Sequence, residues 1–146
     1  MKTVSYLIPG RPIPWKRPKV FSKLNMHKVY DTQKDHKIFT GLYLTKCHGD
    51  NPPFTLGPLH LDAKFYFEPA KSIPYSKRLK IFNTYHTLHL DLDNLLKYIL
   101  DTLVQTETKN STEHILIDDS IVVSITASKH WSQTSRTELI ISEIPQ

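Results

Sequence analysis

The chain has 146 residues, of which 39% are hydrophobic, and it carries a formal net charge of +5. This length fits one domain, 1–146, with enough apolar residues to bury a core without disulfides or structural metals. The single cysteine, Cys47, excludes an intramolecular disulfide and a zinc site built from cysteines. No apolar run reaches the ~20 residues of a membrane-spanning helix. Pro9-Gly10 also breaks the first segment too early for a signal peptide. We therefore expect a soluble, intracellular protein.

The positive charge is concentrated in the first part of the sequence. Residues 1–30 contain seven lysines and arginines and no acid, whereas the other residues carry 12 basic and 14 acidic side chains. The first part thus has a charge of +7 and the rest −2, which together give +5. A basic arm on a nearly neutral body is typical of proteins that bind nucleic-acid phosphates. The same charges also fit an ordinary solvated surface, so they assign no function alone.

The first predicted element is a short β-strand. Thr3–Ile8 is rich in β-branched and aromatic residues and is stopped by Pro9-Gly10. Residues 9–19 contain four prolines, which exclude a helix interior or a central strand. We expect them to form an extended surface segment, with Val29-Tyr30 as a second short extended piece.

A helix is predicted for residues 31–47, and its expected apolar face consists of Ile38, Leu42 and Phe39. Residues 59–67 alternate between apolar and polar, which predicts a strand whose inward side chains are Leu59, Leu61, Ala63, Phe65 and Phe67. Residues 69–90 form a loop with one helical turn at 75–82. This loop carries a second basic cluster, made of Lys71, Lys77, Arg78 and Lys80.

The clearest element is a helix at 92–104. Its apolar residues follow the i, i+3, i+4, i+7 pattern of an amphipathic helix: Leu92, Leu95, Leu96, Ile99, Leu100, Leu103 and Val104. Asp91 precedes it as a natural N-cap, and Asp93 lies in the first turn, where the helix dipole favours negative charge.

The remaining residues predict a loop and three strands. Residues 105–113 are polar and rich in threonine, which indicates the loop. Strands are expected at 115–117, 121–125 and 138–144, with Asp118-Asp119-Ser120 as the turn between the first two. This order of elements indicates an α/β (α+β) domain with a mixed sheet packed by two main helices.

Acidic residues gather at two places along this sequence. Asp93, Lys97 and Asp101 are spaced by four residues, so they share one polar stripe opposite the leucine face. An ordinary helix with a capping Asp91 and an i,i+4 ion pair explains each residue separately. It does not explain two acids at the helix entrance together with the acidic pair Asp118-Asp119 in a tight turn.

A divalent cation explains both concentrations of acid. If Asp119 folds back toward Asp91 and Asp93, three carboxylates converge and repel one another unless a cation neutralises them. Mg²⁺ prefers such oxygen ligands, with Mn²⁺ as a substitute, and can activate water for attack on a phosphodiester. Lys97 would then contact the scissile phosphate. Asp118, the other acid of this turn, stays open as an alternative to Asp119.

The order of these residues resembles the RusA-type Holliday-junction resolvases, which are endodeoxyribonucleases of bacteria and their phages. The resemblance rests on Asp91-Leu-Asp93-Asn94-Leu-Leu-Lys97, on Asp101-Thr-Leu103 and on Asp118-Asp119-Ser120-Ile121-Val122. Ile8-Pro-Gly-Arg11-Pro-Ile-Pro-Trp-Lys16-Arg17-Pro is similar to the family's N-terminal strand and basic loop. Ser76-Lys77-Arg78 is similar to a basic stretch of some members, and Lys129 with the closing strand 137–142 also fits.

The resemblance implies a metal-dependent endonuclease that resolves four-way DNA junctions by paired symmetric nicks in recombination and repair. It implies Asp91, Asp93 and Asp119 as metal-binding catalytic carboxylates and Lys97 as the catalytic lysine. It also implies a homodimer, because two nicks need two sites, and a cytoplasmic protein encoded by a bacterium or phage and associated with the nucleoid. The residues expected to contact DNA are Arg11, Lys16, Arg17, Lys19, Lys77 and Arg78.

Other interpretations of the sequence remain open. The chain could be a non-catalytic protein that binds branched or single-stranded DNA, or a related nuclease for flaps or forks. His86 and His89 could hold a transition metal, although exposed loop residues are the simpler interpretation. Trp15 and Trp131 could stack on unpaired bases. We expect Trp131 to pack against the sheet instead, and the two roles of Trp15 are evenly balanced.

Overall fold

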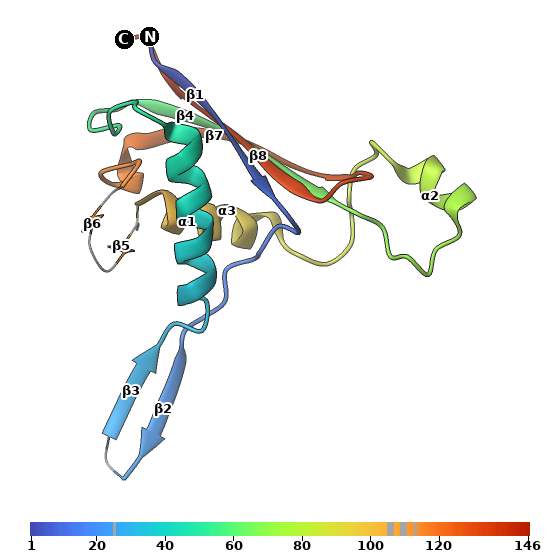
Figure 1. Ribbon diagram of the computed structural model, residues 1–146, viewed down its shortest axis with the longest axis horizontal. Helices are drawn as coiled ribbons and strands as arrows, with labels where there is room; N and C mark the ends of the chain where they lie inside the picture. Colours follow the sequence, from blue (N-terminus) through green and yellow to red (C-terminus); the bar gives the residue numbers. More distant parts are fainter. Residues whose placement is uncertain (25, 105–106, 109–110, 113) are drawn as a thin grey trace.

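The central sheet of the computed structural model has four strands in the order β1-β8-β4-β7 (Figure 1). Strand β1 (Thr3–Pro9) pairs antiparallel with β8 (Arg136–Glu143), which also pairs antiparallel with β4 (Leu59–Phe67). Strand β4 pairs in parallel with β7 (Val122–Trp131), so the sheet is mixed, as the sequence predicts. The structure describes residues 1–24, 26–104, 107–108, 111–112 and 114–146.

Strand β4 provides the centre of the hydrophobic core. Its alternating residues are buried as predicted, namely Leu59, Leu61, Ala63, Phe65 and Phe67. Val4 and Tyr6 of β1 and Leu139 and Ile141 of β8 are buried beside them. The intervening residues Leu7 and Ile140 are exposed, so helices cover only one face of the sheet.

Two long helices, α1 (Lys34–His48) and α3 (Leu92–Val104), cross each other against the sheet, and the short α2 (Tyr75–Ile81) projects beyond it (Figure 1). Both the helical turn expected near 75–82 and the helix expected at 92–104 are confirmed. Helix α3 buries its apolar side in the core through Leu95, Ile99 and Leu103. None of the helices within the described ranges is long and apolar enough to span a bilayer.

The predicted apolar face of α1 is wrong. Phe39 and Leu42 are 63% and 53% exposed. The buried side instead contains Lys37, Thr40, Gly41, Leu44 and His48. These polar side chains face polar partners, because the Thr40 hydroxyl bonds the Tyr98 hydroxyl at 2.9 Å and His48 Nδ1 bonds the Tyr6 hydroxyl at 2.7 Å. A buried polar group with such a partner carries little penalty, so hydrophobicity alone misidentified the face.

The short extended piece predicted at Val29-Tyr30 is part of a longer β-hairpin. Strands β2 (Lys19–Lys23) and β3 (Met26–Tyr30) pair with each other and project away from the body, beyond the first turn of α1 (Figure 1). The predicted loop at 105–113 contains a short antiparallel pair, β5 (Glu107–Thr108) and β6 (Ser111–Thr112). The other residues of that loop, 105–106, 109–110 and 113, lie outside the described residues.

The strand predicted at 115–117 is also absent from the described structure. Leu116 forms only an isolated bridge with Phe54. The amides of Ile115 and Leu116 instead donate to the Leu103 carbonyl at 3.1 Å, near the end of α3. This arrangement buries both side chains without a strand ladder. The turn that follows is a single 3-10 turn, η1 (Asp119–Ile121), which leads into β7.

Candidate active site

The segment that leads into α3 is held along the free edge of β7. The Asn83 amide donates to the Trp131 carbonyl at 2.8 Å, and the Trp131 amide donates to Thr84 at 2.8 Å. The His86 amide donates to the Lys129 carbonyl at 3.1 Å. These bonds satisfy edge groups that would otherwise be unpaired. They also fix the path of the chain between the end of α2 and the start of α3.

Lys129 then fixes the residues immediately before Asp91. Its Nζ donates to the Leu88 carbonyl at 3.1 Å and to the Leu90 carbonyl at 2.9 Å. Leu90 has a φ of +91°, in the left-handed region that residues with a Cβ rarely adopt. Such a conformation persists only when the surroundings hold it. Lys129 therefore sets the backbone from which Asp91 projects.

Asp91 and Asp93 lie at the first turn of α3, with their side chains exposed to solvent. The Asp91 carbonyl accepts the Leu95 amide at 3.2 Å, which is the first intrahelical bond and fits the predicted N-cap position. Asp93 Oδ1 accepts the Asn94 amide at 2.9 Å. Both carboxylates stand where the helix dipole favours negative charge.

The basic proline-rich loop docks against the same turns of α3. The Trp15 amide donates to the Asn94 carbonyl at 2.9 Å, and Lys97 Nζ lies 3.7 Å from the centroid of the Trp15 ring. A lysine above a Trp face is attracted by the ring quadrupole. Lys97 forms no ion pair with any residue that the structure describes. Its charge is therefore held in place while remaining exposed.

Gln33 anchors this loop from the other side. It is 3% exposed, its Nε2 donates to the Pro14 carbonyl at 2.8 Å, and its Oε1 accepts the Lys16 amide at 2.9 Å. The two bonds hold the backbone on either side of Trp15. Nothing in the sequence pattern indicated this role for Gln33, because its partners lie 17 and 19 residues away.

The second acidic group lies further along α3. Asp118 and Asp119 line a pocket of about 150 Å³ together with Leu100, Asp101 and Val104. Asp118 Oδ1 accepts the Ser120 amide at 2.8 Å and so caps η1. This backbone hydrogen bond, with weaker contributions from Ser120 and Asp119 side chains, lowers the pKa of Asp118. Asp118 is thus engaged in local structure through its bond to the Ser120 amide.

Asp101 also contacts α1. Its Oδ2 lies 3.4 Å from Lys37 Nζ, and Asp31 Oδ2 lies 2.9 Å from the same nitrogen. Burial alone would lower the pKa of Lys37, but the hydrogen bonds and charges of the two carboxylates outweigh it, and that pKa is raised. Asp101 therefore connects α3 to α1 through Lys37, in addition to sharing the polar side of α3 with Asp93 and Lys97.

The two acidic groups of the predicted metal site are not united in the structure. Asp91 and Asp93 do not line the pocket of Asp118 and Asp119. Asp93 and Asp101 are separated by two helical turns, or about 12 Å at 1.5 Å per residue. Over the described ranges, no group of three or more His, Cys, Asp or Glu side chains is arranged to hold a metal ion. The convergence of Asp91, Asp93 and Asp119 stays a prediction. Their carboxylate oxygens are the kind of ligand that a hard cation such as Mg²⁺ prefers.

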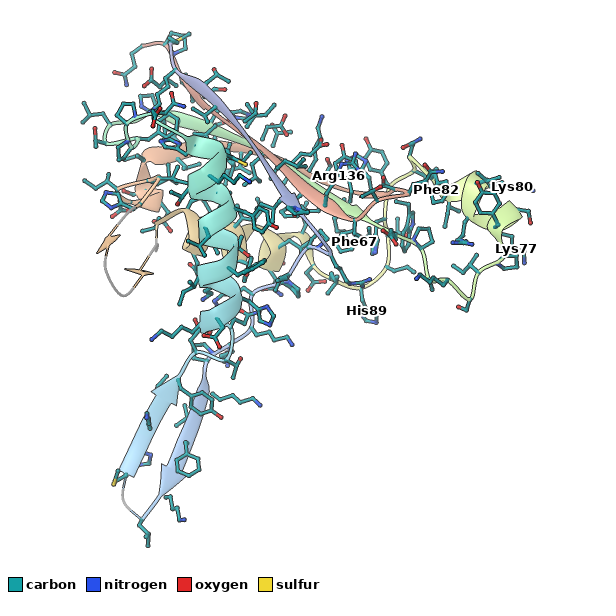
Figure 2. The ribbon with its side chains drawn as sticks, viewed as in Figure 1. Phe67, Lys77, Lys80, Phe82, His89 and Arg136 are labelled. Carbon is teal, nitrogen blue, oxygen red and sulfur yellow. The ribbon has the colours of Figure 1, made fainter. Side chains whose placement is uncertain are left out.

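A basic groove reaches the start of this region. It has a volume of about 440 Å³, and its lining includes Arg11, Lys16, Lys19, Gln33, His36 and Leu90. Three of the predicted DNA-binding residues therefore line a groove that also contains Leu90, the residue directly before Asp91. Arg17 is exposed nearby in sequence, whereas Lys77 and Arg78 lie on the outlying α2 (Figure 2).

Comparison with known proteins places this arrangement in a family. The model of the family described as Endodeoxyribonuclease RusA matches residues 9–142, nearly the whole chain. The chain belongs to the RusA endodeoxyribonuclease family. It is also 26% identical over 151 residues to the uncharacterized protein YqaN of Bacillus subtilis (strain 168), and the match covers 99% of each chain.

Membership of the RusA family identifies the chain as an endodeoxyribonuclease. The matched range contains the Trp15 loop, both acidic groups, Lys97 and Lys129. These residues come from separate parts of the sequence, and the fold brings Trp15 to Lys97 and Lys129 to Leu90. The family's phosphodiester chemistry therefore has basic and acidic groups available around the start of α3.

The predicted roles of the histidines need one correction. His86 is 5% exposed. The centroid of its ring lies 4.1 Å from that of the Trp131 ring and 4.6 Å from that of the Phe67 ring. Burial, together with the charges of Lys129 and Arg11, lowers its pKa. His86 is thus a core residue rather than an exposed loop residue, whereas His89 is exposed (Figure 2). The packing predicted for Trp131 is confirmed.

Proposed function

We propose that this RusA-family chain is a Mg²⁺-dependent endonuclease that resolves four-way DNA junctions by paired symmetric nicks in recombination and repair. The observation that carries the proposal is the basic groove whose lining includes Leu90, the residue directly before Asp91. A duplex backbone lying in this groove would present a phosphate to the carboxylates and to Lys97. Mn²⁺ would substitute for Mg²⁺, because both accept carboxylate oxygens.

Asp91, Asp93 and Asp119 are the residues that would hold the cation. The chemistry that bound Mg²⁺ supplies is activation of water and neutralisation of charge on the phosphate. Asp91 and Asp93 contribute exposed oxygens at the start of α3, Asp119 contributes an exposed carboxylate from η1, and Lys129 contributes the fixed backbone before Asp91. Asp119 is the preferred ligand of the acidic pair because Asp118 caps η1.

Lys97 would contact the scissile phosphate and stabilise the charge that develops on it. The Trp15 ring restricts the position of its ammonium without neutralising it, because the attraction comes from a quadrupole and not from an anion. Trp15 thus acts as a positioning residue in this proposal. The prolines around it limit the conformations of the loop that carries the ring.

We further propose that the active protein is a homodimer. A four-way junction has to be nicked in two strands of like polarity, and a two-fold dimer presents two equivalent sites for this reaction. The uncovered face of the sheet, which includes the exposed Leu7 and Ile140, offers apolar surface for such an assembly. The reaction would take place on bacterial or phage DNA in the cytoplasm.

The deciding experiment uses purified protein, a labelled synthetic four-way junction and a linear duplex of the same sequence, with Mg²⁺ or with EDTA. Symmetric nicks on the junction alone, and only with metal, are the expected result. Tight binding of the junction without nicking in Mg²⁺ or Mn²⁺ would instead support a branched-DNA-binding protein. Flap and fork substrates of related sequence complete the set, and equal cutting of them would overturn the junction specificity while leaving the nuclease chemistry in place.

A further inference from the structure

The β2–β3 hairpin is an arm without a partner in the described structure. All its described residues, 19–24 and 26–30, are exposed, and the hairpin extends away from the sheet and helices (Figure 1). An isolated two-stranded hairpin is at best marginally stable in water. Side chains such as Phe21, Met26 and Val29 are more than half exposed on it. These exposed apolar side chains on a marginally stable hairpin favour a binding partner that covers them.

The strand register divides the hairpin into two different faces. Residues directly opposite each other in an antiparallel pair point to the same face, and successive residues alternate between faces. The pairs Lys19–Tyr30, Phe21–Lys28 and Lys23–Met26 therefore form one face, called here the lysine face. The pairs Val20–Val29 and Ser22–His27 form the opposite face, called here the valine face.

The two faces differ sharply in chemistry. The lysine face carries all three lysines of the hairpin, interleaved with two aromatic rings and a methionine. The valine face contains no Lys, Arg, Asp or Glu. Residues 1–30 contain no acid, and Asp31, the nearest acid along the chain, is paired with Lys37 instead of a hairpin lysine. Cations alternating with aromatic side chains favour a polyanion that also offers flat apolar surfaces.

The lysine face continues the basic groove. Lys19 belongs to this face and also lines the groove with Arg11, Lys16 and Leu90. A polyanion that occupies the groove beside Asp91 would therefore pass directly onto the hairpin. The basic residues of the groove and the lysines of the arm therefore form one continuous positive surface, which runs from Arg11 in the groove through Lys19 to Lys28 on the arm.

We propose that the lysine face of the β2–β3 hairpin is a DNA-binding arm, which contacts the phosphates of a duplex branch outside the active site. This inference rests on the proposed function of the groove beside Asp91. A two-stranded ribbon has dimensions that fit a DNA major groove. A second copy of the chain fits this face less well, because a two-fold contact would bring the lysines of the two copies together.

The test compares Lys23→Gln/Lys28→Gln with the control Val20→Thr/Val29→Thr, which alters the opposite face of the same hairpin, nearer its base. Binding of a fluorescent four-way junction is measured by anisotropy in EDTA at several salt concentrations. Each lost phosphate contact lowers the slope of log K against log salt concentration by about 0.9, so the lysine variant is expected to lose about 2 from the slope. The control variant is expected to keep the slope of the unmodified protein.

Three outcomes overturn the proposal. The first is an unchanged salt slope for the lysine variant, and the second is an equal loss of affinity in both variants. Sedimentation of the same samples identifies a third, because a change of oligomeric state in the lysine variant would make the arm a subunit contact. Because binding is measured without metal, a protein that binds through the arm but never nicks the junction would refute the proposed function and leave the arm standing.

Discussion

The ammonium of Lys97 lies 3.7 Å from the centre of the Trp15 ring, which joins the basic N-terminal loop to the acidic turn of α3. The Trp15 amide strengthens this contact between the loop and α3, because it donates to the carbonyl of Asn94, one helical turn before Lys97. The two residues are 82 positions apart in sequence. Their contact joins the loop expected to bind DNA to the lysine expected to act on phosphate.

Replacing Trp15 by leucine should lower cleavage while leaving the fold intact. Leucine keeps an apolar side chain in the partly buried position but removes the ring that holds Lys97. A cation–π contact at such a site contributes about 1 kcal/mol, which corresponds to about a fivefold slower single-turnover cleavage. Trp15→Phe is the matched control, since it retains a weaker ring. Equal rates for all three proteins would contradict the positioning role.

Asp119→Asn should abolish cleavage, whereas Asp118→Asn should preserve most of it. Loss of a metal ligand removes several kcal/mol of charge stabilisation, or more than about a hundredfold in rate. Asparagine caps a helical turn about as well as aspartate, so Asp118→Asn keeps the bond to the Ser120 amide. The reverse ranking of the two variants in a junction-cleavage assay would assign the ligand to Asp118.

The same assay applies to the acids at the start of α3. Asp91→Asn should bind the junction as tightly as the unmodified protein but should not cut it, because the carboxylate is lost and the backbone bond to Leu95 remains. Binding is checked by gel shift in EDTA and cutting in Mg²⁺. Normal cleavage by Asp91→Asn would refute its assignment as a ligand.

Lys129→Met should reduce cleavage by about tenfold and shift the Mg²⁺ concentration needed for half-maximal rate upward. Methionine keeps the aliphatic stem but loses both bonds to the Leu88 and Leu90 carbonyls, and hydrogen bonds from a charged donor contribute about 1.5–3 kcal/mol each. The left-handed Leu90 would then relax, and Asp91 would shift with it.

The control for Lys129 is Lys64→Met, which removes an exposed lysine from the neighbouring strand β4. It should leave both the rate and the Mg²⁺ dependence unchanged. Thermal unfolding of both variants separates positioning from simple destabilisation. A Lys129→Met protein that is less stable but has an unchanged Mg²⁺ dependence at 25 °C would show that the bonds from Lys129 to Leu88 and Leu90 serve only the fold.

The ion pairs of Lys37 should make the free energy of unfolding depend on pH at both ends of the scale. The hydrogen bond from Lys37 lowers the pKa of Asp31 below its ordinary value of 3.8, so its contribution is present above that pH and is lost as pH falls through the lowered value. The pKa of Lys37 is raised above 10.5, so its contribution is present below that pH and is lost as pH rises further.

Chemical unfolding at pH 3, 7 and 11 checks this dependence against Lys37→Met. At pH 7 the variant should be less stable by about 1–3 kcal/mol, because two carboxylates lose a charged partner. The difference between the two proteins should shrink at pH 3 and at pH 11. A constant difference across the range would mean that Lys37 stabilises α1 through packing and not through charge.

Several elements were predictable because they bury one face against an apolar partner. The residues of β4 and α3 repeat with the periods of a strand and a helix, and both elements occur as expected. The apolar face of α1 was misjudged because its buried side is polar and finds its partners on β1, on α3 and in the residues just before α1. The strand expected at 115–117 failed because the amides of Ile115 and Leu116 bond to Leu103 instead of a neighbouring strand.

The sequence by itself determined the family, the mixed-sheet domain and the residue types available for chemistry, because local periodicity and motif spacing are properties of adjacent residues. Tertiary structure alone decided that Trp15 holds Lys97, that Lys129 holds the residues before Asp91, and that Asp101 shares a pocket with Asp118 and Asp119. It also decided which hairpin face carries the lysines. These relationships depend on strand register and on contacts between distant segments, and no local pattern encodes either of them.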